Sequence, residues 1–263
     1  MKTQRRKRPR ARKPPLTVNE GFQIYSRIGL GAAPGRKRLG FGYRVGTPFP
    51  TLGAANAFCR KLLSGTGPEK YGGLLVVNTK TDAIVGLHGL EVMGVDSNCL
   101  SFIIDAFEGI QKPTDGLAEQ KIALARIFFY TGQTFLTVPT VKRECEDIKD
   151  LVLKAKHQNW MMTHFGTLPI REPPEEIARR AKHFQQFHPK ERDCMVLAEA
   201  EAAQLAILLT FDFDFVDRLT GKSNVVLVKP LDCWKALGIP KGAPPKTVPH
   251  PTNPLIDQSW WVW

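Results

Sequence analysis

Apolar residues after Asn98 fall into short continuous runs that are separated by longer stretches with helical spacing. Runs of about four to eight apolar residues are typical of buried strands, whereas apolar positions three or four residues apart are typical of amphipathic helices. Parallel strands need a crossover connection, which is usually a helix, so alternation of the two patterns indicates a parallel α/β sheet. We therefore predict such a sheet between Asn98 and Leu237.

The predicted elements follow one another in a repeating strand and helix order. Strands are predicted at residues 99–105, 134–138, 206–210 and 225–228, and helices at residues 116–130, 139–152, 175–187, 193–206 and 231–237. Pro139 stands at the start of one of these helices, where the first turn tolerates proline. Residues 157–171 carry neither pattern, and we expect irregular structure there.

The N-terminal part of the chain has a different character. Residues 16–97 are rich in glycine and predict a helix at 51–63 and a hairpin formed by 74–78 and 83–87. Nothing in this segment indicates a reaction. We treat it as an N-terminal extension, a module of unknown function that precedes the α/β unit.

Charge changes the picture only at the N-terminus. The net charge is +12, and eight of the first thirteen residues are Lys or Arg with no acid among them. A segment with so many like charges and nothing apolar to bury does not fold by itself, so residues 1–15 are predicted to be a disordered arm. Either this arm attracts phosphate or serves as a receptor-read address, or it is a solubilising end.

The five cysteines are scattered and form no Cys-x-x-Cys pair. This usage predicts reduced thiols in a cytoplasmic protein. No apolar stretch approaches the length that spans a membrane, so no membrane association is expected. The proline-rich tail, residues 238–263, ends in Trp260-Trp-Val-Trp263. We favour docking of these rings onto the protein or a partner subunit over a stacking platform for bases.

Four acids are predicted to meet at one edge of the sheet, where ligands of such sheets bind. Asp105 and Asp212 follow predicted strands, and Glu144 and Asp193 lie in the early turns of helices that begin at the same edge. Two carboxylates 4 Å apart near a protein surface repel each other by about 4 kcal/mol, which a divalent cation would relieve. Oxygen ligands without His or Cys favour Mg²⁺ or Mn²⁺ over zinc.

These acids stand in four motifs that together resemble, in order, the motifs of PIN-domain nucleases. The motifs are Ile-Ile-Asp105-Ala, Val138-Pro-Thr-Val-Lys-Arg-Glu144-Cys, His188-Pro-Lys-Glu-Arg-Asp193-Cys and Leu-Leu-Thr210-Phe-Asp212-Phe-Asp214-Phe. The resemblance covers about residues 98–237. One departure is that the family often has a small hydroxyl or amide residue after its first acid, where this chain has Ala106 and Phe107.

The resemblance implies a PIN-like, Rossmann-like three-layer fold, in which helices flank a parallel five-stranded sheet. It also implies an endoribonuclease, of the toxin or the RNA-processing type, that hydrolyses RNA through bound Mg²⁺ or Mn²⁺ and an activated water. Asp105, Glu144, Asp193 and Asp212 match the family's catalytic and metal-binding acids, and Asp214 would be an additional ligand. A protein inhibitor of the antitoxin kind and a homodimer are left open.

Several interpretations stay open beside this one. The cations next to the acids either hold RNA phosphates or are solvated helix ends; they are Lys142, Arg143, Lys190 and Arg192. Glu199 and Glu201 are expected to be surface or supporting groups. The alternative functions are a non-catalytic PIN-fold RNA-binding protein and another Mg²⁺-dependent hydrolase such as a phosphatase.

Overall fold

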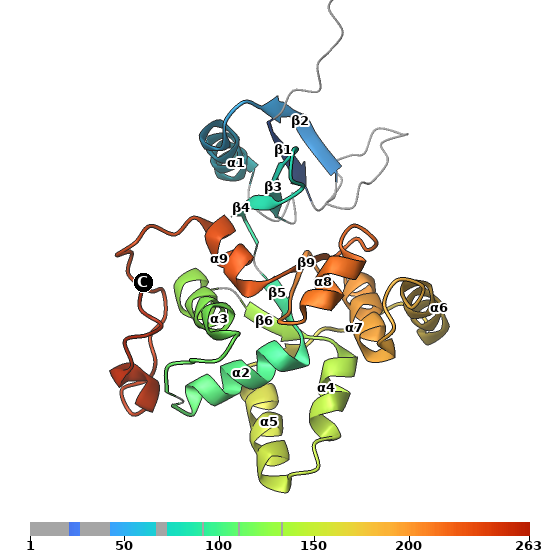
Figure 1. Ribbon diagram of the computed structural model, residues 1–263, viewed down its shortest axis with the longest axis vertical. Helices are drawn as coiled ribbons and strands as arrows, with labels where there is room; N and C mark the ends of the chain where they lie inside the picture. The colour runs from blue at the N-terminus through green and yellow to red at the C-terminus, as the bar shows by residue number, and fades with distance from the viewer. Residues whose placement is uncertain (1–20, 27–42, 67–72, 91, 110, 133) are drawn as a thin grey trace, which may run out of the picture.

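The structure is a computed structural model that describes residues 21–26, 43–66, 73–90, 92–109, 111–132 and 134–263. The predicted basic arm at residues 1–15 lies outside these ranges. The described chain forms two sheets, a four-stranded one in the N-terminal part and a five-stranded one in the remainder (Figure 1).

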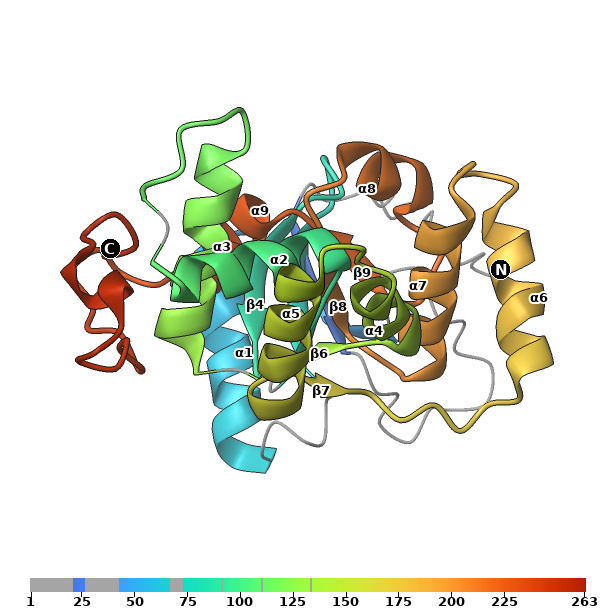
Figure 2. The same ribbon diagram turned by 90° about the horizontal axis from the view of Figure 1, so that it is seen from below.

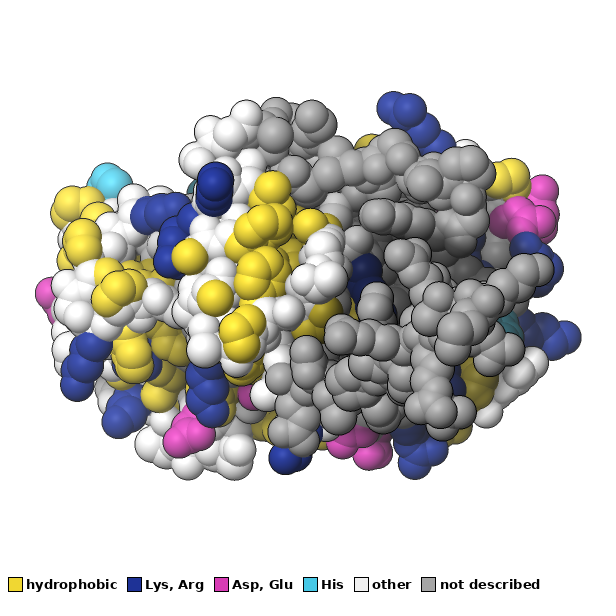
Figure 3. All heavy atoms as spheres, turned by 90° about the horizontal axis from the view of Figure 1, so that it is seen from above, with side chains coloured by type: hydrophobic (Ala, Val, Ile, Leu, Met, Phe, Trp, Pro, Cys, Tyr) yellow, Lys and Arg dark blue, Asp and Glu magenta, His cyan; other side chains and the backbone are white. Residues whose placement is uncertain are grey.

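The N-terminal sheet is antiparallel, with strand order β2-β1-β3-β4. Its elements are β1 Phe22–Ser26, β2 Tyr43–Phe49, α1 Leu52–Thr66, β3 Leu74–Asn78 and β4 Ile84–His88. The predicted helix at 51–63 and the hairpin formed by 74–78 and 83–87 are therefore confirmed, with the second strand shifted by one residue. Figure 3 views the molecule from this end and shows hydrophobic side chains gathered in a strip, with Lys and Arg side chains around it.

The second sheet has five strands, all parallel, in the order β7-β6-β5-β8-β9. They are β5 Val92–Val95, β6 Thr134–Thr137, β7 Gly166–Thr167, β8 Ile207–Leu209 and β9 Val226–Val228. The predicted parallel α/β sheet is confirmed. Its first strand lies on the N-terminal side of Asn98, where the sequence predicted the unit to begin.

Helices flank this sheet and complete the predicted three-layer α/β arrangement. They are α2 Ser97–Phe107, α3 Ala118–Thr131, α4 Pro139–Glu146, α5 Leu151–Thr163, α6 Pro174–Phe184, α7 Glu191–Ala202, α8 Phe213–Leu219 and α9 Pro230–Leu237. Figure 2 shows α2, α4 and α5 together in front of the strands, with α6 and α7 to one side. One continuous core of buried side chains joins the helices to the sheet.

Residues 99–105 form a helix, so the prediction of a strand there was wrong. They belong to α2, which buries Cys99, Leu100, Ile103 and Ile104. The run is so rich in apolar residues that a buried strand and a buried helix fit it equally well. Asp96 decides the outcome, because its carboxylate accepts the N–H of Cys99 at 2.7 Å and thereby caps the helix.

The predicted helix at 139–152 is divided in two. It ends at Glu146, and α5 begins after Asp150, whose carboxylate accepts the N–H groups of Val152 and Leu153. Helix α5 then continues to Thr163, so the irregular structure expected from residue 157 starts later. Helix α8 was not predicted.

The C-terminal tail docks onto the protein, as predicted. The ring of Trp261 is buried and lies 4.6 Å from that of Phe129, and its Nε1 donates to the carbonyl of Leu255. Trp263 packs edge-on against Trp234 with centroids 5.6 Å apart. Trp261 and Trp263 therefore pack against α3 and α9, and Figure 2 shows the tail beside α3.

The five cysteines are buried and unpaired, which agrees with reduced thiols. Burial raises the pKa of Cys59 to about 12 and that of Cys145 to about 11, so neither thiol ionises readily. Among the described residues, no helix has the length and apolar character needed to cross a membrane.

Candidate active site

Asp96 lies directly after β5, in the central part of the parallel sheet. Its N–H donates to the carbonyl of Leu209 on β8, and its carboxylate is hydrogen-bonded to Thr210 and to the N–H of Cys99. It is followed by Ser97 and Asn98, a hydroxyl and an amide residue. Asp96 therefore has both the strand-end position and the following residues that the sequence analysis sought at Asp105.

The charge of Asp96 is costly in this position. Burial raises its pKa to about 6, against the hydrogen bonds from Thr210 and Cys99, which lower it. The negative charge of Asp193 raises it further. A cation at this edge would favour the ionised carboxylate.

Asp212 lies three residues after Leu209, the last residue of β8. Strands β5 and β8 are neighbours with Val95 opposite Leu209, so the residues that follow them emerge at the same edge. The carboxylate of Asp212 caps α8 by accepting the N–H of Phe215 at 3.0 Å. Its own N–H donates to Thr210 Oγ1 at 3.0 Å. The Thr210 hydroxyl thus connects Asp96 and Asp212.

Asp193 comes to this edge from the first turn of α7. Its Oδ2 lies 2.8 Å from Nε2 of the buried His188 and 3.8 Å from Lys190 Nζ. Lys190 also forms an ion pair with Asp212, so one ammonium group bridges two carboxylates. Desolvation opposes ionisation of Asp212, but the hydrogen bonds from Lys190 and Phe215 outweigh it and lower its pKa.

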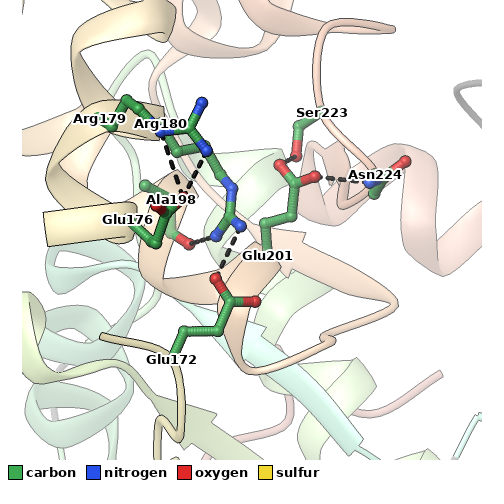
Figure 4. A network of polar contacts seen from close by, with 8 residues as sticks. All are labelled: Glu172, Glu176, Arg179, Arg180, Ala198, Glu201, Ser223 and Asn224. Atoms are coloured by element: carbon green, nitrogen blue, oxygen red, sulfur yellow. Dashed lines mark hydrogen bonds and ion pairs between the residues drawn. The ribbon is translucent and has the colours of Figure 1, made fainter. Parts of the chain in front are cut away.

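Helix α7 is held in place from two sides, as Figure 4 shows. On one side, Arg180 of α6 pairs with Glu172 at 2.7 Å and donates to the carbonyl of Ala198. On the other side, Glu201 accepts hydrogen bonds from Ser223 at 3.0 Å and Asn224 at 2.6 Å. Both contacts fix the helix that carries Asp193.

Glu199 joins α7 to α4. It is only 4% exposed, and its carboxylate accepts the backbone N–H of Thr140 at 2.6 Å and pairs with Arg143 at 2.9 Å. Glu199 is thus a buried supporting group that the helical pattern alone did not distinguish from a surface acid. Arg143, which was predicted to bind phosphate, pairs with Glu199.

Glu144 lies on α4 and faces α7. Its Oε1 is 3.9 Å from Arg192, which also lies 3.5 Å from Asp147. Lys142 lies 4.0 Å from Glu146. The four predicted phosphate-binding cations therefore each face an acid. Asp214 is exposed in the first turn of α8, and its charge helps raise the pKa of Lys190.

Asp105 lies away from the strand end that was predicted for it. It sits near the end of α2, is about half exposed, and pairs with Lys156 at 3.0 Å. Asp105 was predicted as a site residue because it was expected to follow a strand. In the structure, Asp96 has that position.

The donor set at this edge suits a hard divalent cation, since Asp96, Asp193 and Asp212 offer only oxygen. Lys190 already lies between two of them, which shows that the edge accommodates a cation. Within the described ranges, no three or more Asp, Glu, His or Cys side chains are grouped closely enough to hold a metal ion. These acids therefore match a divalent cation in the chemistry of their donor atoms and in their charge, but not in their spacing.

No family model and no curated protein matches the chain. Among solved structures, it is similar to VapBC2 from Rickettsia felis bound to a DNA fragment from their promoter, with 10% identity and a TM-score of 0.32. It is also similar to FitAcB from Neisseria gonorrhoeae, with 14% identity and a TM-score of 0.33. Each match covers 52% of this chain and 97% of the other.

Proposed function

We propose that the α/β unit is a metal-dependent endoribonuclease whose site is the edge formed by Asp96, Asp193 and Asp212. The observation that carries this proposal is the buried Asp96, which directly follows the central strand β5 and whose pKa is raised by burial and by the negative charge of Asp193 on α7. A phosphodiester is an anion, so acids alone would repel it. A divalent ion would both reduce the repulsion between the carboxylates and attract the phosphate.

The residues have separate roles in this proposal. Asp96 and Asp212, from strand ends, and Asp193, from α7, would hold Mg²⁺ or Mn²⁺, with Glu144 completing the set from α4. When bound, the ion would neutralise charge on the phosphate and lower the pKa of a water molecule. Thr210 orients both strand-end acids, and His188 orients Asp193.

RNA as the substrate follows from the motif resemblance to PIN-domain nucleases. The alternative is a protein with the same fold that binds RNA without cleaving it. Only the nuclease would hydrolyse RNA, and this hydrolysis would need a divalent ion.

The test is cleavage of a labelled single-stranded RNA by the purified full-length protein in Mn²⁺, Mg²⁺ or a chelator. We expect cleavage only with a divalent ion, and Asp96→Asn should slow it by about 100-fold or more, a loss of about 3 kcal/mol in transition-state stabilisation. Asp150→Asn is the matched control, because Asp150 is also an N-cap aspartate but caps α5. Binding without cleavage under every metal condition would favour the non-catalytic alternative.

A further inference from the structure

The N-terminal third of the chain carries the whole excess of positive charge. Residues 1–81 contain 17 Lys or Arg and two acids, whereas residues 82–263 contain 20 Lys or Arg and 23 acids. The first thirteen residues hold only eight of the 17 cations, so residues 14–81 are basic by themselves. The part of the chain with the acidic edge is slightly acidic, and its own charge would not attract a polyanion.

Helix α1 presents two of the N-terminal cations to solvent. Its inner face packs on the N-terminal sheet, where Ala55 and Cys59 are fully buried in one cluster with residues of β1 and β3. The opposite face, which we call the outer face of α1, is formed by exposed residues, namely Gly53, Ala54, Ala57, Arg60, Lys61 and Ser64. Arg60 and Lys61 carry its charge, and their neighbours on this face are small, so both cations are accessible.

No nearby acid balances this charge within the described ranges. Before residue 82 these ranges contain neither Asp nor Glu, and the first acid is Asp82, in the turn between β3 and β4. Burial raises the pKa of Cys59 and lowers that of His88, and in both cases the positive charge of Arg60 acts to lower the pKa. No described acid acts on either group. A positive potential is therefore left at α1 for an external anion.

The outer face of α1 suits a phosphate polymer better than a lipid bilayer. A helix that lies on a membrane carries large apolar side chains next to its cations. In the described chain, the large hydrophobic side chains that are exposed all lie between Leu151 and Val262, outside the N-terminal part. Hydrophobic residues beside α1, such as Phe49 and Phe58, are partly buried against the core of the N-terminal sheet. Cations among small side chains fit the phosphates of a nucleic-acid backbone.

We propose that the N-terminal module, formed by β1 to β4 and α1, binds the RNA backbone through Arg60 and Lys61 and so holds the RNA for the acidic edge. This inference rests on the proposed function for the identity of the polyanion. Contacts with phosphates do not depend on base sequence and need no divalent ion. Since both parts belong to one chain, RNA that is bound by the module stays at a high effective concentration around the acidic edge.

The first test measures binding apart from cleavage, with labelled single-stranded RNA and the full-length protein in a chelator. Arg60→Gln/Lys61→Gln should weaken binding by about 10-fold and reduce the slope of log Kd against log salt concentration by about 1.4, as loss of two phosphate contacts does. Arg179→Gln/Lys182→Gln is the matched control, because it removes the same charges from exposed positions of α6. It should leave both quantities nearly unchanged.

The second test uses the wild-type protein, so it does not depend on the folding of a variant. Surface lysines are acetylated with and without RNA, and the modified residues are identified by mass spectrometry. We expect RNA to protect Lys61 and to leave Lys182, at an exposed position of α6, equally reactive. Stronger protection of Lys61 by duplex DNA or by vesicles of anionic lipid would overturn RNA as the partner.

Equal affinity and equal salt dependence of the wild type and Arg60→Gln/Lys61→Gln would overturn the inference, as would a Lys61 that stays reactive in the complex. The outcome for the nuclease is read separately, in Mn²⁺. Weaker RNA binding by Arg60→Gln/Lys61→Gln, with no cleavage by the wild type, would support the module and reject the proposed function. Cleavage by the wild type, with RNA binding unaffected by these substitutions, would support the proposed function and reject the role of α1.

Discussion

The hydroxyl of Thr210 is hydrogen-bonded to the carboxylate of Asp96 across the ends of two neighbouring strands. The same oxygen accepts the N–H of Asp212 at 3.0 Å. Since a hydroxyl has a single proton, that proton is directed to Asp96. The Thr210 hydroxyl therefore interacts with both acids, Asp96 and Asp212.

Replacing Thr210 tests this role. Thr210→Val keeps the branched shape but removes the proton that stabilises ionised Asp96, so Mn²⁺ affinity should fall by about 10-fold or more. Isothermal titration with Mn²⁺ gives the measurement. Thr210→Ser retains the hydroxyl and should bind Mn²⁺ nearly as well as the wild type; equal losses in both variants would assign the effect to packing.

Asp96 should make stability depend on pH. Because its pKa is raised from 3.8 to about 6, its favourable contribution is complete below the ordinary carboxyl pKa and is lost as the pH rises through about 6. Asp96→Asn keeps a good N-cap and removes the charge, so without divalent ions it should be up to about 3 kcal/mol more stable at pH 7. Urea unfolding of both proteins between pH 4.5 and 7.5 checks this.

Adding Asp105→Asn to this comparison distinguishes the two candidate acids, Asp96 and Asp105. Added Mn²⁺ should stabilise the wild type and Asp105→Asn, because Asp105 lies near the end of α2, where it lines one pocket with Asp212 but is already paired with Lys156. It should stabilise Asp96→Asn little. A normal response to Mn²⁺ in Asp96→Asn, together with a lost response in Asp105→Asn, would restore the assignment made from the sequence.

Lys190 should compete with a divalent ion. Its ammonium bridges Asp193 and Asp212, so Lys190→Met leaves these carboxylates without a neutralising charge. We expect a lower Tm in chelator and a larger rise in Tm on addition of Mn²⁺ than in the wild type. Lys182→Met, at an exposed position of α6, is the control. An unchanged response to Mn²⁺ would show that Lys190 and the ion do not share a place.

The tryptophan tail should be part of the stable fold. Trp261 is 4% exposed, packs on Phe129 and hydrogen-bonds to Leu255. Trp261→Ala should lower the free energy of unfolding by about 3–5 kcal/mol, as large-to-small changes in a core do. Val262→Ala, at a half-exposed neighbour, should cost much less. Chemical denaturation distinguishes these values, and similar small losses would contradict the docked tail.

Much of the α/β unit was predictable because its helices and strands carry clear periods. Asp212 was predicted to follow a strand because a short apolar run precedes it, and Asp193 to lie at a helix start because an alanine-rich stretch follows it; the structure has both in these positions. Parallel strands and their helices then bring both to one edge. These inferences needed only the order of elements.

Asp96 was missed because its strand is short and contains Gly94, whereas residues 99–104 are mostly apolar. A buried helix and a buried strand have the same composition over so short a run, so the apolar pattern alone does not separate them. A usable signal was present in Asp96-Ser97-Asn98, an N-cap residue before apolar positions 99, 100, 103 and 104. The contacts of Glu199 with Thr140 and Arg143 join distant parts of the chain, so no local pattern contains them.

The clamp of Glu199 on the N–H of Thr140 has a mechanical consequence. Helix α7 carries Asp193 near its start and Glu199 near its end, and Glu199 binds the first turn of α4. We therefore expect the two helices to move together. We expect Glu144 and Asp193 to keep their relative positions when these helices move. If an ion binds, we expect α4 and α7 to move together, like a hinge, toward the strand ends. Loss of the contact between Glu199 and Thr140 would let Glu144 and Asp193 move separately.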